Sequence, residues 1–296
     1  MKKAYIRRHD LFKNFRRKAT SEIILHILVS AVFMAVALSY LYLIFWMIMS
    51  GAKTHMEVVM NPFGLPETWH WEHFLEVFTE LNVAGHGFWS MLFNSVYFTV
   101  VCASLEIFTT CTFAYCCTKY KFPGSTWPYV IILIMMTLPL YGTGGALYEL
   151  YYKLGLVSSY LQPITSISGM GMSFLYFRAV IQNMSWTYAE AAQMDGANDF
   201  QIYFRVMFPQ LRPICGALFL TTWLGGWNNY ESAQIYLKDL PTLPVGIYQF
   251  NQQMIYAARL DILFAACFII SIPAIILFIT FNKTITTNVS IGGIKG

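Results

Sequence analysis

Residues 23–49, IILHILVSAVFMAVALSYLYLIFWMIM, form a run of 27 residues without one Lys, Arg, Asp or Glu. A helix needs about 20 apolar residues to cross a bilayer. The run is also longer than the roughly 7–15 apolar residues at the centre of a secretory signal peptide. It therefore predicts a helix that stays in the membrane.

The rest of the chain has the composition of a protein that crosses a membrane several times. Of its 296 residues, 57% are hydrophobic and only 11% are charged, whereas soluble domains carry about 25% charged residues. We expect an all-α membrane protein with six transmembrane helices. The five further apolar stretches are residues 88–117, 127–147, 160–177, 214–230 and 262–281.

Lys and Arg residues divide unequally between the segments that join these stretches. With the N-terminus inside the cell, the inner segments hold 15 of the 19 Lys and Arg residues and the outer segments hold four. Because positively charged loops stay in the cytoplasm, we expect both termini inside. The basic N-terminus, 1–22, suits anionic lipid and needs no nucleic acid. The expected six-span domain covers 23–283 and a cytoplasmic tail covers 284–296.

Neither the cysteines nor the histidines predict a metal centre. The six Cys residues form no C-x-x-C pair and no disulfide framework. Four of the six His residues lie in the first outer loop, where His70 and His73 fall on an expected surface helix within residues 66–81. We expect both side chains on a solvated helix face, so no metal site is predicted.

The longest inner segment between two spans reads SWTYAEAAQMDGANDFQIYFRVMFPQLRP over residues 185–213. Thr187 and Glu190 have the spacing of a capping box, which begins a helix, and Gly196 is expected to end it. Asp199 is expected to cap a second helix that leads through Pro209 into the next span. An Ala-rich helix in this position either docks into a groove of a soluble partner or lies on the lipid surface. The residues alone leave both readings open.

The same segment resembles the EAA loop of the permease subunits of ABC importers, in the carbohydrate (maltose-type) family. That pattern is Glu-Ala-Ala, three residues, Gly, nine residues and Ile-x-Leu-Pro, and this chain has Val206 for the Ile and Phe208 for the Leu. Both replacements stay apolar. The residues that carry the resemblance are Glu190, Ala191, Ala192, Asp195, Gly196, Ala197, Val206 and Pro209.

Other parts of the chain resemble the same family. Asn94 and Ser95, followed by Thr99, are similar to its NSxxxT stretch, and YKFPG at 120–124 is similar to its first inner loop. The remaining similar pieces are LGL at 154–156, WNNY at 227–230 and IGGIKG at 291–296.

The resemblance implies a type I ABC importer permease fold in which the loop 183–213 carries a coupling helix. This helix would dock into a cytoplasmic ATPase and pass its movement to the spans. The expected assembly has a second permease subunit, two ATPase subunits and an extracytoplasmic solute-binding protein in a bacterial cytoplasmic membrane. The chain contains no G-x-x-x-x-G-K-[ST] sequence. We therefore expect no catalytic residue and no bound cofactor here, with ATP and Mg²⁺ held by the partner subunits.

Polar and aromatic residues inside the spans are candidates for the solute path. Glu106 lies in the middle of a span, where a charge is costly unless it faces protein or water. It is either a path residue or a neutral carboxyl bonded to a neighbouring span. Trp and Tyr residues near a span end also occur as membrane-interface anchors. The expected path residues are Asn94, Glu106, Trp223, Trp227, Asn228, Asn229 and Tyr230.

By position in the family pattern, the last outer loop is expected to contact the binding protein. The residues concerned are Tyr248, Gln249, Asn251, Gln252 and Tyr256. The function indicated is a permease for a di- or oligosaccharide. The alternatives are a proton-coupled transporter that uses Glu106, an ABC permease for another polar solute such as glycerol phosphate, and an intramembrane enzyme. The last lacks any paired nucleophile and base in the spans.

Overall fold

The computed structural model describes residues 20–120, 122–138, 142, 144–257 and 259–288. The side chains of 20, 21, 254–257 and 282–288 are outside this description. The described chain is helical almost throughout, apart from a short antiparallel hairpin that pairs Asn82 with Gly87. The turn of the hairpin places Ala84 and Gly85 at positive φ, 51° and 83°.

The helices of the first half begin with α2 (Thr20–Gly51), α3 (His55–Met60) and α4 (Glu72–Glu80). The hairpin strands β1 (Asn82–Val83) and β2 (His86–Gly87) lead into α5 (Phe88–Lys119). The following elements are α6 (Trp127–Thr137), α7 (Gly144–Lys153), the 3₁₀-helix η1 (Gln162–Ser166) and α8 (Met172–Gln182).

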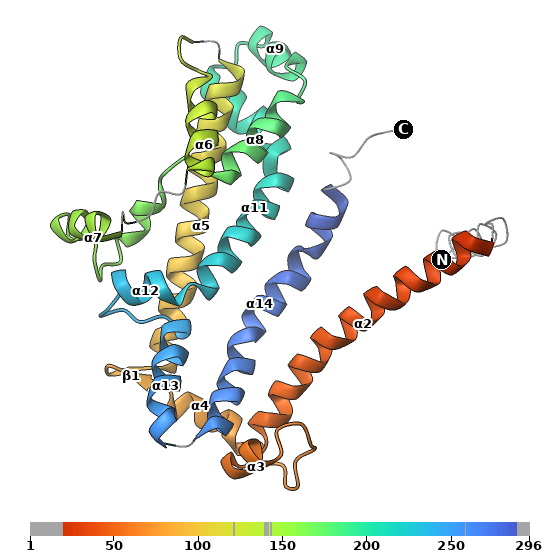
Figure 1. Ribbon diagram of the computed structural model, residues 1–296. Coiled ribbons are helices and arrows are strands. Elements are labelled where there is room, and N and C mark those ends of the chain that lie inside the picture. The colour runs from red at the N-terminus through yellow and green to blue at the C-terminus, as the bar shows by residue number, and fades with distance from the viewer. Residues whose placement is uncertain (1–19, 121, 139–141, 143, 258, 289–296) are drawn as a thin grey trace.

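The second half begins with the short helices α9 (Thr187–Met194) and α10 (Asp199–Gln201), which lead into the π-helix η2 (Ile202–Met207). The remaining helices are α11 (Phe208–Asn228), α12 (Tyr230–Tyr236), α13 (Leu243–Ala257) and α14 (Leu260–Asn288). Figure 1 shows α9 at one end of the molecule and α3 and α4 at the opposite end, with α5, α11 and α14 running between them.

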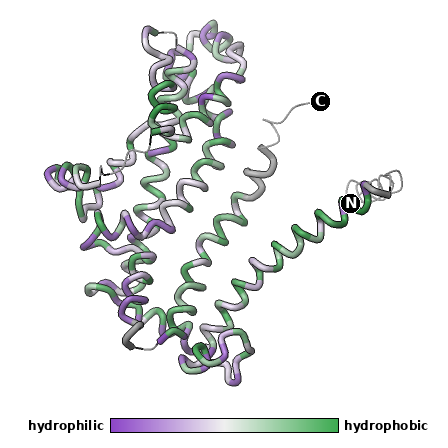
Figure 2. The backbone as a smooth tube through the Cα atoms, viewed as in Figure 1, coloured by the Kyte–Doolittle hydropathy of each residue, from purple (hydrophilic) through white to green (hydrophobic). Residues whose placement is uncertain are grey.

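Three described helices are long and apolar enough to cross a bilayer: Glu22–Gly51, Phe88–Lys119 and Leu260–Phe281. They agree with the first, second and sixth predicted spans. Figure 2 shows apolar residues continuing along α2 and α14. The most apolar window of Glu22–Gly51 is 0% buried, so this part of the helix is exposed to lipid or to a partner. The end of the helix is packed, because Met49 is buried and the rings of Trp46 and Phe264 lie 4.9 Å apart. The count of six spans and the orientation stay predictions.

The third and fourth predicted spans are wrong as continuous helices. The helix that was expected over 127–147 ends at Thr137, because Leu138 takes an extended backbone, φ −91° and ψ 116°. Pro139 follows it in the sequence, and a proline disfavours the helical conformation of the residue before it. The stretch 160–177 holds only η1 and the first part of α8, because Gly169 and Gly171 interrupt it at φ 62° and 135°.

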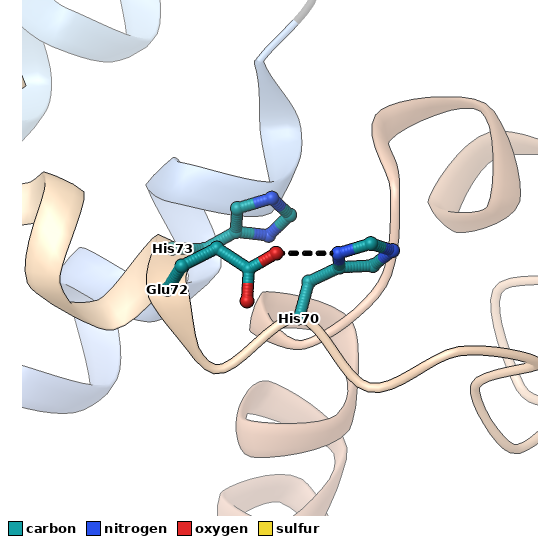
Figure 3. Close-up of side chains that lie close together, drawn as sticks. All are labelled: His70, Glu72 and His73. Carbon is teal, nitrogen blue, oxygen red and sulfur yellow. Dashed lines mark hydrogen bonds and ion pairs between the residues drawn. The ribbon is translucent and has the colours of Figure 1, made fainter.

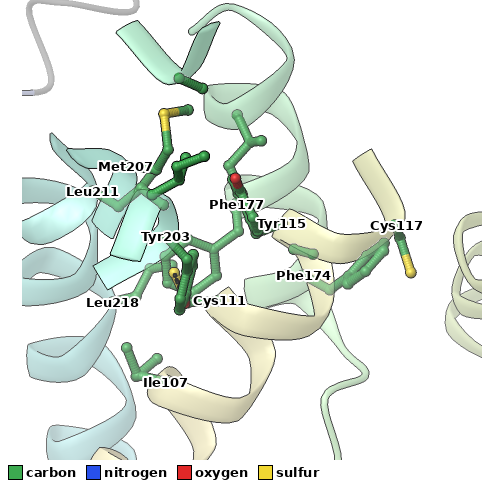
Figure 4. Packing of buried hydrophobic residues seen from close by; sticks show 14 of the residues in the cluster. Ile107, Cys111, Tyr115, Cys117, Phe174, Phe177, Tyr203, Met207, Leu211 and Leu218 are labelled. Carbon is green, nitrogen blue, oxygen red and sulfur yellow. Dashed lines mark hydrogen bonds between the residues drawn. The ribbon is translucent and has the colours of Figure 1, made fainter. Parts of the chain in front are cut away.

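Two groups of buried side chains hold the molecule together, and α5 and α11 contribute one half of their length to each. The inner core, near α9, joins α5, α8, η2 and α11, and includes Tyr115, Phe177 and Tyr203 (Figure 4). The outer core joins α4, α5, α11, α13 and α14, and includes Trp227 and Phe250. The two groups fix α5 and α11 side by side along the length of the protein.

Candidate functional site

The candidate coupling helix, α9, begins without the predicted capping box. Its N-cap is Trp186, whose own side chain makes no capping bond, and the Thr187 N–H donates to Ser185 Oγ over 3.3 Å. Ser185 Oγ in turn donates to Thr187 Oγ1 over 3.0 Å. The predicted pairing of Thr187 with Glu190 is wrong because the helix begins one residue earlier than that pairing requires, so Thr187 is already its first helical residue.

The end of α9 agrees with the prediction that Gly196 ends it. Gly196 has φ 83°, its N–H donates to the Gln193 carbonyl over 3.0 Å, and the Ala197 N–H donates to the Ala192 carbonyl over 3.0 Å. These two bonds form a Schellman motif, which satisfies the last carbonyls of a helix through a left-handed residue. Gly196 therefore fixes the direction in which the chain leaves α9.

The second helix of the loop is capped by Asn198 and not by Asp199 as predicted. Asn198 Oδ1 accepts from the Gln201 N–H over 2.9 Å, and Gln201 Oε1 accepts from the Asn198 N–H over 3.0 Å. This is a reciprocal capping box. From Asp199 the chain stays helical through η2 into α11, so the loop and a long helix of the bundle form one continuous element.

The loop is fixed firmly on the inner core. The Ala189 side chain is buried against it, and the rings of Tyr115 and Tyr203 lie 4.8 Å apart beneath the loop. Lys119, in the last turn of α5, donates to the Met184 carbonyl over 2.9 Å and lies 5.5 Å from the Trp186 ring. A force on α9 therefore reaches α5 and η2 through direct contacts.

The outward face of the loop carries large apolar side chains that the sequence reasoning missed. Tyr188 is 61% exposed, Met194 is 88% exposed and Phe200 is 77% exposed. Such exposed apolar residues next to a carboxylate suit a protein contact. The signal was available in the sequence, because Tyr188 and Met194 flank the Glu-Ala-Ala segment.

The predicted coupling residues divide between the two faces of the loop. Exposed side chains point away from the core, and half-buried ones support the loop. The exposed set is Glu190, Ala191, Asp195 and Gly196, and the half-buried set is Ala192, Ala197, Val206 and Pro209.

A polar cavity of about 280 Å³ lies between α5, η1, α11 and α12. One face of α5 lines it with Ser95, Thr99, Cys102 and Glu106, which are spaced as one face of a helix requires. Gln162 of η1 lines the opposite side. The spacing on α5 could have been found in the sequence, but the approach of η1 could not.

Three of the predicted path residues, Glu106, Trp227 and Asn229, line this cavity. Two others do not. Asn94 is buried, donates to the Pro241 carbonyl over 3.1 Å and accepts from Tyr160 Oη over 3.2 Å. The Trp223 ring is buried and stacks on Trp227 at 4.9 Å. Both side chains therefore lie packed against other parts of the chain.

A second cavity, of about 500 Å³, lies between α11, α13 and α14 and is also lined by Trp227. Asn228 and Tyr230 line it, as do Tyr248 and Asn251, which were predicted to contact the binding protein. The rings of Tyr230 and Tyr248 stack at 4.7 Å. Two predicted groups of residues therefore meet at one cavity.

The other residues predicted to contact the binding protein lie on α13. Gln249 is half-buried and Gln252 is exposed. The side chain of Tyr256 and the tail sequence at 291–296 lie outside the described residues.

The segment around α4, predicted to be a solvated helix of the first outer loop, departs from that prediction. His73 is buried, and its Nδ1 lies 3.2 Å from the Gly51 carbonyl, while its Nε2 lies 3.5 Å from Asp261 Oδ2. It therefore joins α4 to the end of α2 and the start of α14. His70 is half-buried, and its Nδ1 lies 2.7 Å from Glu72 Oε1 (Figure 3).

Ligand atoms of His70, Glu72 and His73 lie within 4.8 Å of one another, a spacing that a metal ion could bridge. Each histidine also has protein partners at both ring nitrogens: Thr68 and Glu72 for His70, and Gly51 and Asp261 for His73. These bonds give the cluster a structural role in the outer loop, joining α4 to its neighbours.

The chain is similar to permease proteins of bacterial sugar transport systems. The chain is 27% identical over 255 residues to the arabinooligosaccharides transport system permease protein AraQ of Halalkalibacterium halodurans, which covers 84% of this chain and 89% of that protein. It is 26% identical over 251 residues to the diacetylchitobiose uptake system permease protein NgcG of Streptomyces coelicolor, covering 83% and 82%.

A solved structure has the same fold. It belongs to a bacterial ABC transporter involved in the import of the acidic polysaccharide alginate, with a TM-score of 0.73 and 22% identity over 90% of this chain and 98% of that one. A family model, the binding-protein-dependent transport system inner membrane component, matches residues 107–290, which is more than half of the chain. The chain therefore belongs to that family, as a non-catalytic permease subunit of an ABC importer.

Proposed function

We propose that this chain is one of two permease subunits of an importer for a di- or oligosaccharide. Movement of a cytoplasmic ATPase would displace the loop 183–213. The spans would then rearrange so that the path opens alternately to the two sides of the membrane. Membership in the family decides against the proton-coupled transporter and the intramembrane enzyme.

The observation that carries this proposal is the continuous helical connection between the loop and the polar cavity. The segment runs from Asp199 through η2 and α11 to Asn228. The loop presents exposed side chains at one end of it, and Trp227 lines the cavity at the other end. Movement of the loop would therefore change the walls of the cavity.

The partners and cofactors follow from the same proposal. Glu190, Tyr188 and Met194 are the exposed groups that would contact one ATPase subunit. ATP and Mg²⁺ would be bound by two such subunits, because this chain carries no phosphate-binding loop sequence. A second permease subunit would complete the path, and an extracytoplasmic binding protein would deliver the solute.

A saccharide is favoured over glycerol phosphate by the charge of the cavity. No Lys or Arg is among the described residues that line it, and phosphate recognition normally uses those side chains. The named relatives that carry oligosaccharides agree with this reading.

The test compares Glu190→Ala and Gly196→Val in the assembled complex with the control Glu80→Ala. Glu80 is an exposed carboxylate on α4, at the opposite end of the molecule. We expect sugar uptake and sugar-stimulated ATP hydrolysis to fall at least about tenfold in both loop variants, a loss of about 1.4 kcal/mol of coupling. The control should behave like the wild type.

Membrane insertion of each variant is checked by its yield in the membrane fraction. Wild-type uptake and stimulation in both loop variants would contradict the coupling role. Failure of the wild-type complex to transport any oligosaccharide would contradict the proposed solute class.

A further inference from the structure

The Glu106 carboxylate occupies an unusual position for a charged group. It is half-buried in the middle of α5 and faces the polar cavity. Among the described residues, none donates a hydrogen bond to it, and no cation lies within ion-pair distance of it. It is also the one charged side chain among the described residues that line the cavity.

A half-buried carboxylate without a partner is unfavourable, because it has lost water and gained no donor in exchange. A ligand that brings hydroxyl donors would remove that penalty. Adjacent hydroxyls of a sugar ring can donate to both oxygens of one carboxylate, and hydrogen bonds to a charged acceptor are stronger than those between neutral groups.

The other walls of the cavity also suit a saccharide. Phe98 and Tyr236 supply apolar surface for the C–H face of a ring, and Gln162 supplies an amide. Asn229 is less available to hydrogen-bond a sugar, because its side chain already caps α12 by accepting from the Ser232 N–H over 3.0 Å. At about 280 Å³ the cavity is near the lower size limit of small-molecule sites, about 300 Å³, and can hold a small part of an oligosaccharide.

We propose that this cavity is a saccharide-binding site within this subunit, and that the unpaired Glu106 carboxylate accepts sugar hydroxyls and excludes saccharides that carry a carboxylate. A second negative charge in a poorly solvated space is repelled, and no cation of the cavity offsets the repulsion. The inference rests on the proposed function and adds the rule by which the path selects its solute.

The experiment measures binding to the purified complete transporter in detergent at pH 7.5, without the binding protein. The probes are arabinotriose, galactotriose, maltotriose and diacetylchitobiose, and then the uronic acid made by oxidising one primary alcohol of whichever neutral sugar binds most tightly. Oxidation of a primary alcohol adds one carboxylate and keeps every ring closed, so the ratio of the two dissociation constants reports the charge filter.

We expect the wild type to bind the neutral sugar at least about tenfold more tightly than its uronic acid. Glu106→Gln keeps the shape of the side chain, and should reduce that ratio to near one, mainly through tighter binding of the acid. Gln162→Glu places a second carboxylate in the cavity and should increase the ratio. Glu149→Gln makes the same charge change on exposed α7, and should leave the ratio unaltered.

The outcomes separate the two claims. If the wild type binds a neutral sugar but Glu106→Gln and Gln162→Glu leave the ratio unchanged, the filter is overturned and the proposed function stands. If Glu149→Gln changes the ratio as much as Glu106→Gln, the effect is one of net charge and the filter is again overturned. If no neutral saccharide binds the wild type, both the filter and the proposed solute class fail.

Discussion

The inner core and the outer core differ in how far apart in the chain their parts lie. The inner core is built from residues 107–218 around the coupling loop, whereas the outer core joins residues 77–270. The outer end is further held by long-range polar bonds: Asn94 donates to the Pro241 carbonyl, and Ser95 Oγ accepts from the Leu243 N–H over 2.7 Å. An end of the molecule that is built from segments close together in the sequence can be recognised by a local sequence motif. An end that is built from segments far apart in the sequence cannot.

The sharpest test of this difference removes one buried ring from each core. Phe177 in the inner core and Phe250 in the outer core are both buried. Each change to Ala should destabilise the protein by about 3–5 kcal/mol, because it leaves a cavity. Only Phe177→Ala, beneath the loop, should also lower the amount of sugar imported per ATP hydrolysed. The measurements are the thermal inactivation midpoint of the complex and the transport-to-hydrolysis ratio in proteoliposomes.

If Phe177→Ala and Phe250→Ala lowered the amount of sugar imported per ATP hydrolysed equally, the inner core would have no special part in transport. An unchanged midpoint in Phe177→Ala would show that the ring is not packed as described.

A smaller effect separates two glycines on either side of η2. Gly196→Ala places a side chain at φ 83°, in the left-handed region, and should cost about 1–2 kcal/mol. Gly225→Ala lies within α11 with open space around the new methyl group, and should stabilise the helix by about 0.5–1 kcal/mol. Opposite shifts of the thermal midpoint are expected, and shifts of the same sign would contradict the Schellman end of α9.

The smallest expected effect is a pH dependence in the outer loop. The hydrogen bond from His70 lowers the pKa of Glu72 below its ordinary value of 4.5. A lowered carboxyl pKa stabilises the folded protein above that ordinary value, and the stabilisation is lost as the pH falls through the folded pKa. As the pH falls from about 5 to about 3, the thermal midpoint should therefore fall slightly more in the wild type than in His70→Gln. Parallel curves for the two proteins would refute the contribution of this bond.

Much of the inner end could be predicted from the sequence. The end of α9 at Gly196 follows from the conformational freedom of glycine, and the long helices α5 and α14 follow from unbroken apolar runs. The N-terminal caps could not be placed with the same accuracy, because Asn198 and Asp199 are adjacent and both are common caps. The position of Pro139 was enough to predict the break after Thr137, but an apolar count over 127–147 overlooked it.

The outer end was harder to predict for a different reason. The burial of His73 depends on Gly51 and Asp261, which lie 22 residues before it and far beyond it in the chain. The sequence of α4 alone does not show this environment. Likewise, the sequence shows that Glu106 would place a costly charge inside a membrane span. It does not show the cavity that Glu106 lines, because that cavity forms only when η1, α11 and α12 pack against α5.

The unbroken passage from η2 into α11 has a mechanical consequence. The 21 residues of α11, at about 1.5 Å of rise each, span about 31 Å. If a helix of this length rotates by about 10° about one end, its other end moves by about 5 Å. This displacement is comparable to the width of a sugar ring. If the loop 183–213 moves as proposed, a small rotation of α11 would therefore be enough to widen or narrow the cavity that Trp227 lines.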